Sequence, residues 1–77
     1  MKSRLLLSGR AHFAAVDMRQ RGLRIEFLLG LPLKHPRIER VVRVTDDNYS
    51  HFVRISSRAD IDAQLLQWLK AAYELRR

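Results

Sequence analysis

The chain has 77 residues, which is enough for one small hydrophobic core and excludes a second domain, so we treat residues 1–77 as a single domain. It contains no cysteine, which excludes disulfides and thiolate zinc sites, and its 47% hydrophobic content excludes a disordered chain. Fifteen Lys and Arg against eight Asp and Glu give a net charge of +7, which favours contact with polyanions but does not specify a fold.

The N-terminal sequence has only part of the pattern of an export signal. Lys2 and Arg4 precede the apolar run Leu5–Leu7, whereas an export signal needs about 7–15 apolar residues. No stretch approaches the roughly 20 apolar residues of a membrane-spanning helix. We therefore expect a cytoplasmic protein without a membrane span.

The N-terminal half is predicted to form three antiparallel strands. Residues 3–7 and 11–17 pair as a hairpin in this prediction, with Gly9 taking the positive φ that a tight turn requires. Residues 17–22 form the next turn. In residues 23–29 apolar side chains alternate with Arg24 and Glu26, the pattern of a strand with one face in water. The apolar positions are Leu23, Ile25, Phe27 and Leu29.

Residues 30–36 are predicted to be a loop, because Gly30, Pro32 and Pro36 prevent the strand from continuing. Residues 37–44 form the fourth strand of the prediction. Its inward positions are Ile38, Val42 and Val44, with Arg40 on the inward side near an edge; its outward positions are Glu39 and Arg43.

A turn at residues 45–48 leads into the fifth predicted strand, residues 49–55. Val53 and Ile55 are expected to pack inward. Because side chains alternate across a strand, Tyr49 and His51 then share the inward face, while Phe52 and Arg54 point away from it.

The C-terminal segment is predicted to be an amphipathic helix. Ser57 is a favourable N-cap, and Asp60 three residues later completes a shortened capping box. Apolar residues then recur every three or four positions, as on a helix that lies on a sheet. This stripe comprises Ile61, Leu65, Trp68, Leu69 and Ala72. The elements together indicate an α+β domain, an antiparallel sheet of about five strands with one C-terminal helix packed on one face.

No catalytic or metal-binding motif is present in the sequence. His12, His35 and His51 are widely separated, and they lack the spacing of known histidine metal motifs. The serines fit no nucleophile motif, and the acidic pair Asp46 and Asp47 is typical of a turn. We expect a protein that is not an enzyme, has no cofactor or metal, and has no evident small-molecule substrate.

The outward sheet positions are the candidate contact face, with Arg24, Arg43, Phe52 and Arg54 as its main residues and His12 beside them. Cations beside an aromatic ring can hold single-stranded nucleic acid by stacking and phosphate contact. Apolar side chains also fall on this face, and an apolar patch there favours a protein partner or a second copy of the chain. These are Leu28, Val41 and Phe52, with Leu6 or Ala14 as possible additions. Both alternatives, protein contact or homo-oligomer and nucleic acid, stay open.

The segments "HPRIERVV" and "YSHFVRISSRADIDAQLLQWLKAAYE" resemble the bacterial family catalogued as domain of unknown function 5655, and "RAHFAAV" is similar to an upstream strand of that family. The shared pattern falls on Pro36, Arg37, His51, Asp60, Asp62, Trp68, Leu69, Ala72 and Tyr73. The resemblance implies no enzymatic activity and transfers no catalytic residue, so Ser57, Asp60, Trp68 and Tyr73 are expected to be structural. Members of the family commonly have a helix before the strand that begins here at Lys2. We therefore expect either a shortened gene product or a sheet surface that is exposed or covered by another subunit.

Overall fold

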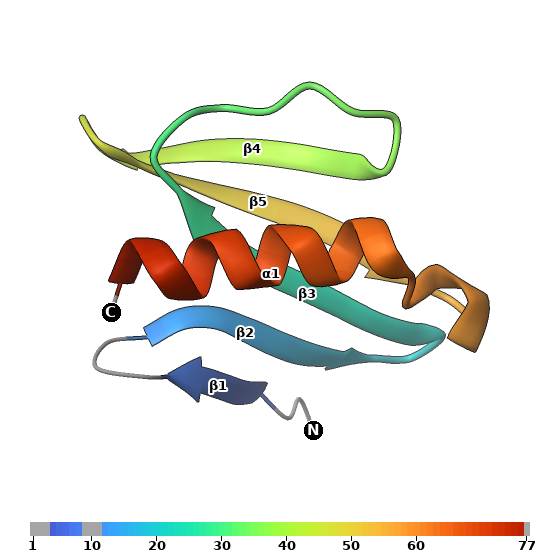
Figure 1. Ribbon diagram of the computed structural model, residues 1–77. Helices are drawn as coiled ribbons and strands as arrows, with labels where there is room; N and C mark the ends of the chain where they lie inside the picture. Colours follow the sequence, from blue (N-terminus) through green and yellow to red (C-terminus); the bar gives the residue numbers. More distant parts are fainter. Residues whose placement is uncertain (1–3, 9–11, 77) are drawn as a thin grey trace.

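The computed structural model describes residues 4–8 and 12–76 and shows an antiparallel sheet with one C-terminal helix across one face (Figure 1). The elements are β1 (Arg4–Ser8), β2 (His12–Arg19), β3 (Gly22–Leu29), β4 (Ile38–Thr45), β5 (Asn48–Ile55), the 3₁₀ helix η1 (Arg58–Asp60) and α1 (Ala63–Arg76). The predicted α+β class with a C-terminal helix is confirmed. The predicted turn at Gly9 lies outside the described residues.

The sheet has the strand order β1-β2-β3-β5-β4, and every neighbouring pair is antiparallel. β5 lies between β3 and β4, so the loop after β3 carries the chain past the position of β5 to the edge of the sheet (Figure 1). β1 and β4 are therefore the two edge strands.

The hydrophobic core lies between α1 and the central strands. Phe27, opposite both Ala14 and His51 in the register, is fully buried, and its ring stacks on that of Trp68 at 5.7 Å between centroids. Burying a side chain of this size contributes about 2–3 kcal/mol. The buried hydrophobic cluster consists of Ala14, Ile25, Phe27, Val53, Ile55, Leu65, Trp68 and Ala72. The predicted inward alternation of residues 23–29 and 49–55 is confirmed by the register.

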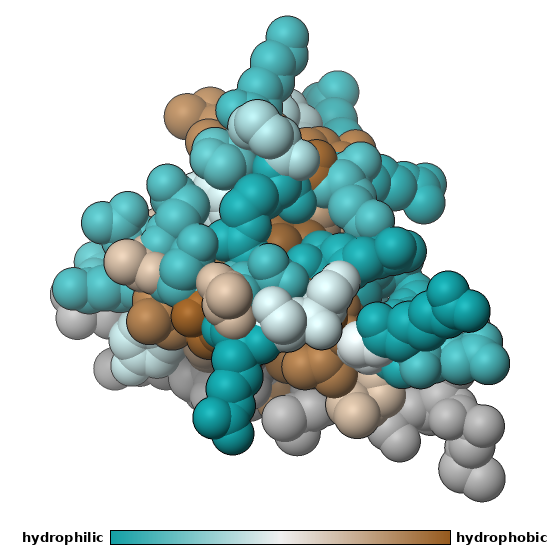
Figure 2. Space-filling view, turned by 90° about the vertical axis from the view of Figure 1, so that its right-hand side faces the viewer, coloured by the Kyte–Doolittle hydropathy of each residue, from teal (hydrophilic) through white to brown (hydrophobic). Residues whose placement is uncertain are grey.

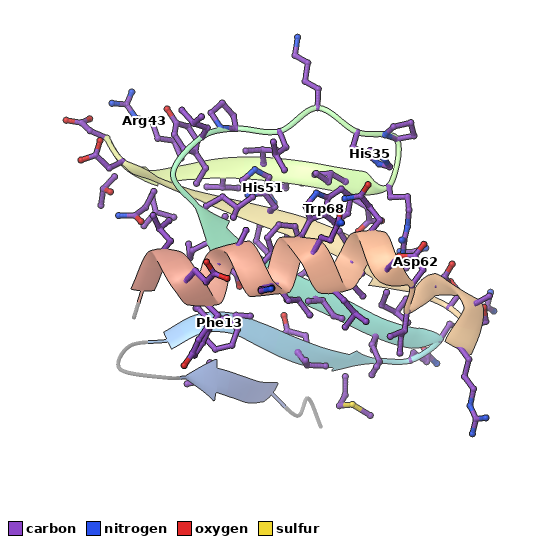
Figure 3. The ribbon with its side chains drawn as sticks, viewed as in Figure 1. Phe13, His35, Arg43, His51, Asp62 and Trp68 are labelled. Carbon is purple, nitrogen blue, oxygen red and sulfur yellow. The ribbon has the colours of Figure 1, made fainter. Side chains whose placement is uncertain are left out.

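A bulge in β2 turns Phe13 toward the helix. Leu7 pairs with Ala14 and Ser8 with His12, which leaves Phe13 without an opposite residue on β1. Such an extra residue redirects its side chain. The Phe13 ring meets the Tyr73 ring edge to face at 5.4 Å (Figure 3).

The predicted inward positions of β4 are only partly correct. Ile38 lies opposite Val53 on the helix side, as expected, but the register then shifts between Ile38 and Arg40. Because a shift of one residue moves every following side chain to the other face, Val41 lies opposite His51 on the helix side. Arg40 and Val42 consequently face away from the helix, opposite Phe52 and Ser50, and Val44 is exposed.

The predicted helix start is also corrected. Ser57 caps η1 only, with the Asp60 carboxylate accepting hydrogen bonds from the backbone N–H groups of Ser56 and Ser57. α1 begins after Asp62, whose Oδ1 accepts from the Leu65 N–H at 3.0 Å. Ile61 consequently precedes the helix and is exposed, whereas the stripe Leu65, Trp68, Leu69 and Ala72 packs inward as predicted.

The loop between β3 and β4 is fastened to the start of the helix. Arg37 Nη1 donates to Asp62 Oδ1 at 2.8 Å, and the His35 ring meets Trp68 edge to face at 5.0 Å (Figure 3). The Leu65 N–H, followed by the Arg37 guanidinium, lowers the pKa of the Asp62 carboxyl. Within residues 4–8 and 12–76, the structure contains no helix of the length and apolar character that a membrane span requires.

Candidate contact face

The sheet face opposite α1, called the outer face below, has no helix over it in the described part of the chain (Figure 1). Directly paired residues of an antiparallel sheet project on the same side, so the register identifies its members. Across the sheet they form three rows. The first row is Asp17, Arg24 and Arg54, the second is Leu6, Ala15, Glu26, Phe52 and Arg40, and the third is Leu28, Ser50 and Val42.

The first row places two guanidinium groups next to each other. Arg24 of β3 lies directly opposite Arg54 of β5. Like charges in this position destabilise a sheet. A carboxylate on each outer side compensates them, since Asp17 lies 3.6 Å from Arg24 Nη2 and Glu39 lies 3.5 Å from Arg54 Nε.

Phe52 and Arg24 form a cation–π contact on this face. The Arg24 Cζ atom lies 5.0 Å from the centre of the Phe52 ring, within the range in which a guanidinium is attracted to the ring face. Arg24 Nε is buried and has no hydrogen-bond partner in the structure. The guanidinium is thus held in place by contacts that leave part of its hydrogen-bonding capacity unused.

Apolar side chains occupy much of the remaining outer face. Leu6 is 45% exposed, and Leu28, Val42 and Phe52 are partly buried. At the centre of this face, Ala15 and Ser50 are buried. The Ser50 hydroxyl donates to Glu26 Oε2 at 2.8 Å, so a polar pair lies among the apolar groups.

The structure brings together three of the four predicted contact residues, Arg24, Phe52 and Arg54. Arg43 is not on this face, contrary to the prediction. The register shift in β4 places it opposite Tyr49 on the helix side, where it forms an ion pair with Asp46 at the other end of the sheet (Figure 3). Val41 and Ala14, also considered for this face, lie on the helix side. His12 begins β2, and its side chain lies outside the described part of the structure.

His51 has a structural role on the helix side of the sheet. Its buried ring stacks on Phe27, its Nε2 accepts from the Leu33 N–H at 3.1 Å, and its Nδ1 lies 3.0 Å from the Tyr49 carbonyl oxygen. Because Nε2 accepts a hydrogen bond, it carries no proton. Nδ1 then carries the proton and donates to the Tyr49 carbonyl, so the ring is neutral. Burial lowers the pKa of His51, against smaller opposing effects of backbone hydrogen bonds. Among the described residues, no three His, Asp or Glu side chains are grouped to hold a metal ion.

One known family matches almost the whole chain. The model of the family described as a domain of unknown function (DUF5655) matches residues 1–76. The chain belongs to this family. No curated protein and no solved structure shows a significant match to the chain. The family therefore identifies the domain, and its function has to be inferred from the outer face.

Glu39 and Asp17 are residues of the outer face whose importance the sequence does not reveal. Each is a single acidic residue in a strand pattern, which is typical of a solvated position. Their pairing with Arg54 and Arg24 depends on the order β2-β3-β5-β4, with β5 inside the sheet. The signal in the sequence is that Asp17 and Glu39 each lie in a strand next to a strand with an outward arginine. This signal alone does not predict the ion pairs.

Proposed function

We propose that this domain is a non-catalytic interaction module that associates with a second copy of itself through the outer face. The observation that supports this proposal is the composition of that face. Antiparallel sheets commonly leave one face in water, but such faces are then mainly polar. Here Leu6, Leu28, Val42 and Phe52 all remain at least partly accessible on one surface.

The charges of the outer face favour a second copy as the partner. Three described basic side chains lie on this face or at its border, and three acidic ones accompany them; the basic residues are Arg24, Arg40 and Arg54, and the acidic ones are Asp17, Glu26 and Glu39. The described side chains of the face are therefore balanced in charge, although the chain carries +7. In a two-fold dimer the same surface meets itself, and a face with both signs can match its own copy.

A basic nucleic-acid-binding face is the second candidate. The contact between Arg24 and Phe52 supplies a cation and an aromatic ring together, the two groups that hold single strands. Arg24 already covers one side of that ring, and the acidic residues alternate with the cations. Both features favour self-association over nucleic acid.

Light scattering on the intact chain, from low to high micromolar concentration, tests the proposal. We expect a mass that rises from one chain to two and changes little with salt, because the face is apolar and balanced in charge. A strict monomer at high micromolar concentration contradicts self-association. Binding of oligonucleotides with an affinity that falls steeply as the salt concentration rises would favour the second candidate instead.

A further inference from the structure

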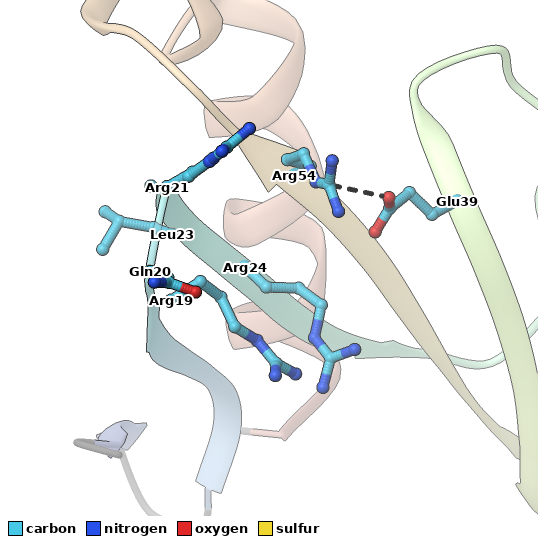
Figure 4. Close-up of a pocket in the computed structure, with 8 residues that line it drawn as sticks. Arg19, Gln20, Arg21, Leu23, Arg24, Glu39 and Arg54 are labelled. Carbon is cyan, nitrogen blue, oxygen red and sulfur yellow. Dashed lines mark ion pairs between the residues drawn. The ribbon is translucent and has the colours of Figure 1, made fainter. Parts of the chain in front are cut away.

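A cavity of about 350 Å³ lies at one end of the outer face, beside the turn that joins β2 to β3 (Figure 4). Its polar lining consists of Arg19, Gln20, Arg21, Arg24, Glu39 and Arg54. These residues come from the β2–β3 hairpin, from the end of β5 and from the start of β4. This end of the molecule, which faces the viewer in Figure 2, is covered mainly by hydrophilic side chains.

The backbone of the turn gathers the arginines. Gln20 and Arg21 connect the strands, and Gly22, which lies opposite Arg19, has a φ of 129°. A side chain is disfavoured at that angle, and a Cβ there would lie 2.4 Å from the Ile55 carbonyl oxygen. The glycine thus lets β3 begin directly against β5. This brings Arg19 and Arg21 near the pair of Arg24 and Arg54.

The positive charge in the cavity is only partly compensated. The Arg54 side chain is 71% exposed and pairs with Glu39. Arg24 Nη2 lies 3.6 Å from Asp17 Oδ2, which is longer than a hydrogen bond. Neither Arg19 nor Arg21 takes part in an ion pair within the described structure. Four guanidinium groups therefore share one lining carboxylate.

We propose that this arginine cavity binds a phosphate-bearing small molecule, with the phosphate groups held by Arg19, Arg21, Arg24 and Arg54. Guanidinium groups match phosphate oxygens with two parallel hydrogen bonds, and they remain charged at any physiological pH. The volume lies within the range of roughly 300–1,000 Å³ that is usual for small-ligand sites. A bound anion would also relieve the repulsion between Arg24 and Arg54, which lie directly opposite each other.

The distribution of charge favours a small ligand over a nucleic-acid strand. A groove for single strands follows the backbone with cations along its length. Here the cations are concentrated around one cavity, while Glu26 and Asp17 interrupt them across the sheet. This inference does not rest on self-association. Arg24 and Arg54 belong to the first row of the outer face, but Arg19 and Arg21 lie beyond the three rows, at the end of β2 and in the turn that follows.

Calorimetric titration with inorganic pyrophosphate and with ADP tests the proposal at about 0.15 M salt, where non-specific attraction is screened. Arg19 ends β2 and Arg21 lies in the turn, and both are exposed, so Arg19→Gln and Arg21→Gln should stay folded, which circular dichroism verifies. We expect each to weaken pyrophosphate binding by about tenfold, in line with the loss of a charge-assisted hydrogen bond. Glu39→Gln removes the competing carboxylate and should tighten binding by about threefold.

Arg43→Gln is the matched control, because it removes the same charge from an exposed arginine at the other end of the sheet. Its affinity should stay within about twofold of the unmodified chain. An equal loss in Arg43→Gln and Arg21→Gln would show that only net charge matters, and absence of pyrophosphate binding at millimolar concentration would overturn the site. Binding of an oligonucleotide without terminal phosphate, in the absence of pyrophosphate binding, would overturn the assignment to a small ligand. Repeating the titration with Leu28→Lys, designed to block the dimer, should leave the affinity unchanged and separates this proposal from self-association.

Discussion

Arg24 and Arg54 lie directly opposite each other on β3 and β5, and the carboxylate of Glu39 on β4 lies 3.5 Å from Arg54. Two arginines paired across strands repel each other unless a carboxylate or another anion lies beside them. The stability of this part of the sheet therefore depends on Glu39 and on ionic strength.

Glu39→Gln should destabilise the fold at low salt. Because Arg54 and Glu39 are both more than one third exposed, solvent screens the pair, and the loss should be only about 0.5 kcal/mol. The effect should disappear at about 0.5 M salt, where the screening length is short. Urea unfolding at both salt concentrations measures it. Asp46→Asn, which breaks the exposed Arg43 pair, should cost less at low salt, and equal costs for the two variants would contradict the role of Glu39.

Gly22→Ala should destabilise the domain by about 2 kcal/mol or more, because alanine is strained at a φ of 129° and its Cβ would collide with the Ile55 carbonyl. Gly30→Ala is the matched control, since a Cβ there meets only ordinary contacts at 3.7 and 3.9 Å. That change should alter the free energy of unfolding by less than about 1 kcal/mol. Thermal unfolding of the two variants compares the sites, and a similar loss in both would contradict the close approach at Gly22.

Trp68→Ala should leave the chain largely unfolded. Trp68 is buried against Phe27 and His35, and removing such a side chain costs about 3–5 kcal/mol, a large share of the stability of a domain this small. Far-ultraviolet circular dichroism detects the loss of structure without relying on tryptophan fluorescence. Leu66→Ala, at a side chain that is 56% exposed on the same helix, should cost less than about 0.5 kcal/mol. A folded Trp68→Ala variant would show that this contact is not essential to the core.

The domain should lose stability as the pH falls below about 6.5. The buried His51 is neutral in the folded chain and its pKa is lowered from the usual 6.5, so below that value the unfolded chain binds the proton first. Its contribution is thus fully present above pH 6.5, and it declines as the pH falls toward the lower folded pKa. Urea unfolding from about pH 7.5 to about pH 5.5 measures this slope.

His51→Gln is the comparison for that experiment. It should be less stable at every pH, because the hydrogen bonds with Leu33 and Tyr49 change, but it should lose the part of the slope that belongs to His51. The same slope in both chains would mean that another group is responsible for the pH dependence.

The strand faces were predictable from the sequence where alternation is regular. Leu23, Ile25 and Phe27 give the inward face of β3 directly, and Val53 and Ile55 do so for β5. In β4 the bulge after Ile38 depends on pairing with β5, and no residue type marks it, so Val42 was placed on the wrong face and Arg43 was grouped with the wrong cluster.

The helix start was missed because two capping residues compete. Ser57 and Asp60 have the pattern of a capping box, and they do form a short 3₁₀ helix, but Asp62 begins the main helix. Arg37 stabilises that second start from a loop 25 residues earlier in the chain, a tertiary contact that local sequence does not encode. The same limit applies to the arginine cavity, which needs the neighbours β3 and β5.

Sedimentation equilibrium on Leu28→Lys and Leu66→Lys tests most directly whether the outer face joins two copies of the chain. Both variants add one positive charge at a leucine, the first on the outer face and the second on the exposed side of α1. We expect Leu28→Lys to be monomeric at concentrations where the unmodified chain and Leu66→Lys form dimers. Dimers of equal strength in all three chains, or disruption by Leu66→Lys alone, would contradict an interface on the outer face.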